Sequence, residues 1–132
     1  MPYSPTGGGL LTGKYGALTR PETGRLLDNK MYEVRYGADA NFELAESFCA
    51  LAQEHGHAPA ALAIAWVAAH PAVTAPIVGT RSVAHLEVAL SSMEIELDHE
   101  SELYRQISAL CPAPPPATDR NEETSAHNYG AR

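Results

Sequence analysis

The strongest pattern of hydrophobic and polar positions lies between Asp39 and Gly56. Apolar residues recur there at spacings of three and four, which is the period of an amphipathic helix. We expect a helix whose first turn is capped by Asp39 or Asn41. It runs to about His55, and Gly56 stops it. The positions on its predicted buried face are Phe42, Ala45, Phe48, Cys49 and Ala52.

A second helix is predicted from Pro59, since proline is favoured at the first helical position. It continues through the alanine-rich stretch AALAIAWVAAH until His70 and Pro71 end it. The density of alanine predicts close packing against a neighbouring surface. The larger contacts on that surface would come from Leu62, Ile64 and Trp66.

The chain from Thr74 onward predicts a strand and then two helices. TAPIVG, at Thr74–Gly79, has the composition of a buried parallel strand covered on both faces. Ser82 can cap the helix that follows, and Asp98 can cap a further one. This order of helix, strand, glycine turn and helix is the alternation of an α/β protein with a parallel sheet. The apolar stripes of the two helices are Val83, Leu86 and Leu90, and then Leu103, Ile107 and Leu110.

Two segments lack any sustained period. Gly16 to Tyr36 mixes glycine, proline and charges, which predicts a long surface loop of the kind that is more often functional than idle. Residues 111–132 are rich in proline and polar residues, which predicts an extended tail. The folded part is therefore expected to span residues 1–110.

The charge and composition of the chain exclude some classes of binding partner. The chain of 132 residues has a net charge of −7 and no cluster of basic residues along one face, so neither nucleic acid nor an anionic membrane is expected as a partner. No run approaches the ~20 apolar residues of a membrane helix. Its two cysteines, Cys49 and Cys111, stand far apart and no signal peptide is indicated, so we expect a reduced, cytoplasmic protein.

Two glycine-containing motifs carry candidate chemistry. The first is MPYSPTGGGLLTGKY, Met1 to Tyr15, whose glycine triplet allows either a left-handed turn or the close approach of a ligand. The second is VGTRS, where the backbone N–H groups at a helix start, with a partial charge of roughly +0.5, join Arg81 in a candidate anion site. An ordinary capped turn with a solvated arginine remains the alternative for VGTRS.

The two motifs together resemble a known family. YSPTGGGLLTGKY, followed by LAIAWVAAHPAVTAPIVGTRSVAHLEVAL, is similar to the C-terminal part of the aldo-keto reductases, most nearly the bacterial and aflatoxin-aldehyde-reductase-like branches. The resemblance covers Met1 to Leu110, and the closing AHNYGAR fits it as well. It implies a C-terminal fragment of a (β/α)8 TIM barrel, mostly helical with one or two short parallel strands. On this view the chain starts inside the seventh strand.

The family binds NADPH, so the resemblance assigns roles around that cofactor. Tyr3 would stack on the nicotinamide, although a core aromatic is the alternative. Ser4 and the loop after it would wrap the pyrophosphate with help from Lys14, and Arg81 with its neighbours would receive the 2′-phosphate. His85 would lie beside the adenine or, alternatively, be an exposed helix histidine. The implied cofactor-binding residues are Tyr3, Ser4, Thr6, Gly8, Lys14, Gly79, Thr80, Arg81, Ser82 and His85.

The chain departs from the family at two kinds of position. Val88 and Ala89 stand where the family commonly holds the adenine amino group with polar side chains. The catalytic Asp, Tyr, Lys and His of the family lie on earlier strands, so no catalytic residue is assigned here. His55 and His57 lack ligand partners at metal spacing and are expected to be solvated, which leaves no predicted metal site.

The resemblance therefore implies an NADPH-dependent reductase of aldehydes or ketones, represented here by its cofactor-binding part. We expect the 132 residues alone to be inactive, because the proton donor is not among them. The expected partners are a carbonyl substrate in the intact enzyme and either a complementing N-terminal segment or further copies of the chain. A non-catalytic helical binding or interaction module derived from that fold is the alternative.

Overall fold

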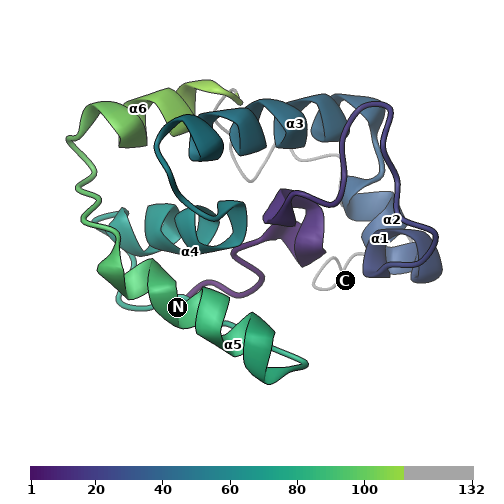
Figure 1. Ribbon diagram of the computed structural model, residues 1–132, viewed down its shortest axis with the longest axis horizontal. Helices are drawn as coiled ribbons and strands as arrows, with labels where there is room; N and C mark the ends of the chain where they lie inside the picture. The colour runs from purple at the N-terminus through teal and green to yellow at the C-terminus, as the bar shows by residue number, and fades with distance from the viewer. Residues whose placement is uncertain (112–132) are drawn as a thin grey trace, which may run out of the picture.

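The computed structural model describes residues 1–111, and their architecture is almost entirely helical (Figure 1). Two layers are visible: α3 and α6 lie along one side of the molecule, and α4 runs below them, with α5 beyond it. The 3-10 helix η1 lies between α4 and the short helices α1 and α2. In chain order the elements are η1 (Gly7–Thr12), α1 (Arg25–Asp28), α2 (Lys30–Tyr36), α3 (Asp39–Glu54), α4 (Pro59–Ala69), α5 (Val83–Leu90), η2 (Ser91–Glu94) and α6 (Glu102–Ala109).

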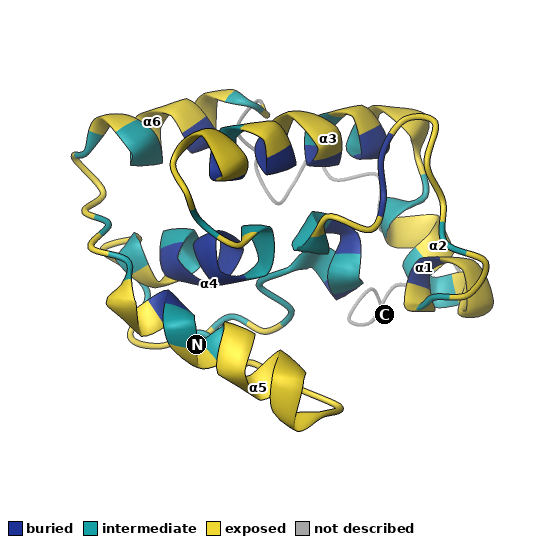
Figure 2. Ribbon diagram, in the orientation of Figure 1, coloured by how far each residue is buried: buried dark blue, intermediate teal, exposed yellow. Residues whose placement is uncertain are grey.

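Helix α3 confirms the predicted amphipathic pattern. The predicted face is buried in full and packs inward, while the opposite face is exposed (Figure 2). The expected cap is wrong: Ala38 occupies the N-cap and no side chain caps the helix, so Asp39 is its first helical residue. Gly56 follows the helix end with a φ of 73°, a left-handed conformation that glycine adopts without steric cost.

Helix α4 forms the centre of the larger core. It begins at Pro59, as predicted, and Leu62 on it is fully buried against α3 and α6. The indole N–H of Trp66 donates to Ser108 Oγ at 3.2 Å, and the Trp66 ring stacks on Tyr104 with the ring centroids 5.8 Å apart. These contacts join α4 to α6. The buried residues of this core are Phe48, Cys49, Ala52, Leu62, Ala63 and Ile107.

The predicted surface loop from Gly16 to Tyr36 is wrong in part, because it contains α1 and α2. Asn29 caps α2 by accepting a hydrogen bond from the Met31 N–H. The segment is also anchored: the Arg20 guanidinium lies 3.4 Å from the centroid of the Phe42 ring on α3. A second core of Leu10, Tyr15, Leu26, Phe42 and Ala45 joins η1 and α1 to α3.

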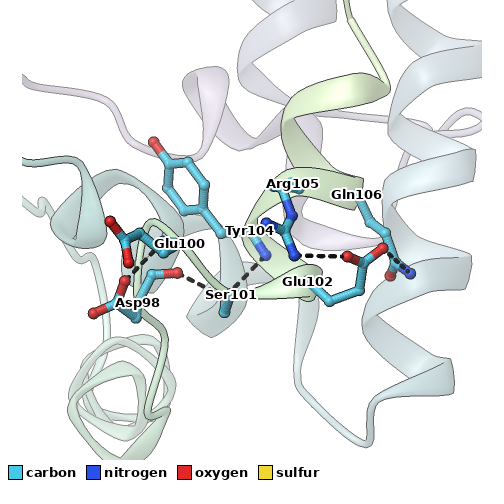
Figure 3. A network of polar contacts seen from close by, with 7 residues as sticks. All are labelled: Asp98, Glu100, Ser101, Glu102, Tyr104, Arg105 and Gln106. Carbon is cyan, nitrogen blue, oxygen red and sulfur yellow. Dashed lines mark hydrogen bonds and ion pairs between the residues drawn. The ribbon is translucent and has the colours of Figure 1, made fainter.

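Helix α6 starts three residues later than the expected cap would place it. Ser101, not Asp98, is its N-cap, and Ser101 Oγ accepts from the Tyr104 N–H at 3.2 Å (Figure 3). Asp98 instead accepts from the Glu100 N–H through its side chain and from Ser101 Oγ through its carbonyl. Its carboxylate therefore stabilises the turn before the helix rather than the helix itself.

The predicted buried strand at Thr74–Gly79 is wrong. Residues 1–111 form no strand, and only an isolated parallel bridge pairs Tyr3 with Ile77, whose N–H donates to the Pro2 carbonyl at 2.8 Å. Ile77 is 50% exposed and Val78 38% exposed. A parallel strand needs paired neighbours and covered faces, and the described residues supply one bridge and only partial cover.

Helix α5 is also more exposed than its apolar stripe predicts. Ser82 caps it as expected, accepting from the His85 N–H. Val83, Leu86 and Leu90 are nevertheless 71%, 44% and 53% exposed. The described part of the chain therefore presents an apolar surface on α5 that its own residues do not bury.

Both cysteines are free thiols, Cys49 buried and Cys111 exposed. Burial raises the pKa of the Cys49 thiol; a hydrogen bond with the Gly13 backbone lowers it, and the Glu46 carboxylate raises it further. Cys49 is thus held as an unreactive core thiol. No helix within residues 1–111 has the length and apolar character needed to cross a membrane.

Candidate functional site

A cleft of about 620 Å³ separates the N-terminal loop from the segment that leads into α5. Helix α4 contacts both η1 and α5, so Ala60 and Ile64 of α4 form the floor between the two walls. Figure 1 shows the N-terminal segment passing close to α5, where the bridge between Tyr3 and Ile77 ties the two walls together. The volume lies within the range of small-molecule and cofactor sites.

The first wall is the glycine loop. Gly8 is buried and has a φ of 68°, and a Cβ on it would lie 2.5 Å from Cδ1 of the Tyr32 ring. Only glycine therefore lets Tyr32 of α2 pack directly on this turn. The side chain of Lys14 folds back toward Gly9, so its ammonium group lies at the edge of the same turn.

The second wall comes from Ile77–Arg81 and from α5. Arg81 and His85 line the cleft, and both residues are exposed. Val88 and Ala89 continue the same wall further along α5. This wall therefore changes from cationic at the start of the helix to apolar at its end.

The charge of the cleft is opposite to that of the chain. Lys14, Arg25 and Arg81 line it, and none of the described lining residues is Asp or Glu, although the chain carries a net charge of −7. Three cations without a carboxylate around one hollow attract an anionic ligand, because the low-dielectric walls focus their field. The arrangement suits phosphate groups, which arginine binds with two parallel N–H donors.

The structure gathers the predicted site residues around this one cleft, with one exception. Ser82 does not line it, since its hydroxyl is engaged as the cap of α5. Tyr3 is 67% exposed, which makes the alternative of a core aromatic wrong. The predicted residues that line the cleft are Tyr3, Ser4, Thr6, Gly8, Lys14, Gly79, Thr80, Arg81 and His85.

Arg25 lines the cleft, although the sequence pattern did not single it out. It lies at the start of α1, and its guanidinium is 5.2 Å from the centroid of the Tyr32 ring, which itself packs on Gly8. Arg25 approaches the glycine loop through Tyr32, so its position depends on how α1 and α2 fold back onto that loop. The sequence offered one general signal for Arg25: long loops are often functional. That tendency does not identify a particular residue.

No metal site is evident in the described part of the chain. No three or more His, Cys, Asp or Glu side chains of residues 1–111 are placed to hold a metal ion. His55 and His57 lie at and just beyond the C-terminal end of α3, away from the cleft residues. The donor groups of the cleft are ammonium, guanidinium, hydroxyl and imidazole, which favour anion binding over cation coordination.

Comparison with known proteins shows the family of the chain. The chain belongs to the aldo/keto reductase family, whose profile matches residues 1–108. It is 34% identical over 116 residues to the uncharacterized oxidoreductase YrpG of Bacillus subtilis (strain 168), covering 85% of this chain and 32% of that protein. It is 28% identical over 102 residues to Protein tas of Escherichia coli (strain K12), covering 76% of this chain and 29% of that protein.

A plant relative is similar to the same extent. The chain is 29% identical over 100 residues to probable aldo-keto reductase 1 of Glycine max, covering 76% of this chain and 29% of that protein. The chain thus spans about a third of the length of these relatives. The family has a TIM-barrel fold, and two of these relatives are named as an oxidoreductase and as an aldo-keto reductase. The assignment to the aflatoxin-aldehyde-reductase-like branch stays a prediction.

Proposed function

We propose that this chain forms the NADPH-binding part of an aldo-keto reductase that reduces an aldehyde or a ketone. The observation that carries the proposal is the cationic cleft in which the glycine loop and the start of α5 meet. Lys14 and Arg25 would hold the pyrophosphate against the glycine loop. Arg81 and the backbone N–H groups at the start of α5 would hold the 2′-phosphate.

The chain's own share of the reaction is binding and orientation. When bound, NADPH supplies the hydride that reduces a carbonyl carbon. The exposed ring of Tyr3, at the bridge with Ile77, would stack on the nicotinamide and leave one face of it open to the substrate. Proton donation to the carbonyl oxygen is assigned to a tyrosine of the family's earlier strands, outside this sequence. The free cysteines suit a reducing compartment such as the cytoplasm.

The uncovered apolar surface of α5 indicates that another segment packs on it. Val83 and Leu90 are both more than half exposed. Large apolar residues are rarely exposed side by side on one face of a folded protein. The relatives are about three times as long as this chain. We therefore propose that a complementing barrel segment covers this surface in the active reductase and completes the pocket for the carbonyl substrate.

Replacing Arg25 with alanine tests the proposal in a way that the fold alone does not. We expect binding of both NADPH and NADH to weaken roughly 3- to 10-fold, because the two share a pyrophosphate and an exposed charge contributes at the lower end of its range. The measurement is isothermal titration of the full chain. Arg105→Ala is the matched control, since Arg105 pairs with Glu102 at 3.0 Å and lies outside the cleft.

Two outcomes would contradict the proposal. One is that the unaltered chain binds neither dinucleotide, which would favour the non-catalytic interaction module. The other is that Arg25→Ala and Arg105→Ala bind NADPH equally well, which would remove Arg25 from the site.

A further inference from the structure

Resting on the proposed function, we propose that the cleft holds the base of the dinucleotide without recognising its exocyclic amino group. The site would then accept hypoxanthine in place of adenine. The inference concerns the apolar end of the second wall, formed by Val88 and Ala89. It makes the phosphates, and not the base, the source of specificity.

The spacing along α5 determines what the base meets. His85 lies one turn after Arg81, and Val88 and Ala89 follow one turn later, and all four line the same cleft. At 1.5 Å per residue, Val88 lies about 9 Å along the axis from the cap Ser82. With the 2′-phosphate at Arg81, as the proposed function has it, a base that extends along α5 would lie against Val88 and Ala89.

The side chains that line the cleft do not discriminate the edge of the base. An adenine amino group is a donor only, and its selective recognition by a side chain needs an obligate acceptor such as a carboxylate or carboxamide oxygen. No Asp, Glu, Asn or Gln is among the described residues that line the cleft. The hydroxyl of Thr80 can donate or accept, and so can the two nitrogens of His85 according to tautomer. Both therefore suit the amino group of adenine and the carbonyl of hypoxanthine equally.

Apolar contact does not restore the discrimination. Val88 and Ala89, together with Ile77 and Val78 of the same wall, offer apolar contact to a flat face of the base. The flat faces of adenine and hypoxanthine are nearly the same. A hydrophobic surface rejects an analogue of the same shape only weakly, whereas a hydrogen-bonding site rejects it strongly.

The experiment compares NADPH with its hypoxanthine analogue, reduced nicotinamide hypoxanthine dinucleotide phosphate, by isothermal titration of the full chain. We expect the two dissociation constants to agree within about 3-fold. If NADPH binds and the analogue binds more than about 10-fold more weakly, the inference is overturned while the proposed function stands. If neither binds, the proposed function fails and the inference fails with it.

A substitution gives the site the missing acceptor. Val88→Glu places a carboxylate where the base is expected, and we expect it to shift the preference toward NADPH by about 10-fold relative to the analogue, as one charge-assisted hydrogen bond would. Leu90→Glu is the control, because it adds the same charge to α5 at a residue that does not line the cleft. Equal ratios for the two variants would place the base away from Val88 and overturn the inference.

Discussion

Arg81→Ala is expected to weaken NADPH binding about 10-fold and to leave NADH binding nearly unchanged. The reason is that only NADPH carries the 2′-phosphate, and a charge-assisted hydrogen bond to it from an exposed arginine contributes at the lower end of about 1.5–3 kcal/mol. Arg81 lines the cleft beside the start of α5, where the helix N-terminus adds to its positive potential. Titration of both dinucleotides into the two proteins measures the effect.

Salt and a conservative variant sharpen this test. The preference for NADPH should shrink as ionic strength rises, because a charge pair at the surface is screened. Arg81→Lys keeps the charge but loses the bidentate donor geometry of arginine. Its affinity for NADPH should therefore lie between those of the unaltered chain and Arg81→Ala. Equal losses for both dinucleotides would give Arg81 a structural role, and no loss for either would leave VGTRS as a capped turn with a solvated arginine.

Leu62→Ala is expected to lower the free energy of unfolding by about 2–5 kcal/mol, because it removes buried methyl groups and leaves a cavity. Leu62 is fully buried at the centre of the larger core, and Ala60 and Ile64 on the same helix form the floor of the cleft. Urea unfolding followed by the fluorescence of Trp66, which stacks on Tyr104, measures the change.

The matched control is Leu90→Ala on α5. Leu90 is 53% exposed, so its loss should cost less than about 1 kcal/mol. Similar losses for the two variants would contradict the assignment of the core to α3, α4 and α6.

The helices that sequence reasoning predicted well are those in which local pattern and burial agree. The apolar period of α3 is long, and every predicted position on its face is buried. Proline at the start of α4 and serine before α5 act through local chemistry, which is why Pro59 and Ser82 were found where expected. Buried faces and caps of this kind depend on neighbours a few residues away.

The errors occur where the outcome depends on distant residues or on short elements. The four residues of α1 and seven of α2 are too short to show a helical period, although Asn29 was an available capping signal. Asp39 and Asp98 were predicted as caps, but Ala38 and Ser101 occupy the N-cap positions. Neighbouring residues within one turn can each begin a helix, so the sequence does not fix the first residue. The region 112–132, where an extended tail was predicted, lies outside the described residues.

The strand and the site show the same division. Ile77 has a strand-like neighbourhood in sequence, yet a strand forms only when others pair with it, and residues 1–111 offer one bridge at Tyr3. The predicted residues that line the cleft were identified because two motifs carry them. Arg25 was missed because its approach to the glycine loop depends on the packing of Tyr32 against Gly8.

The central claim is that NADPH binds between the glycine loop and the start of α5, and an NMR titration tests it most directly. In a nitrogen-15 correlation spectrum of the full chain, NADPH should shift the backbone amides of residues 6–13 and 79–82 together, with one common dissociation constant. The amides of α6, which lies on the far side of α4 from α5, should stay in place (Figure 1). Shifts confined to one of the two loops, or centred on α6, or absent from both loops at millimolar NADPH, would contradict the claim.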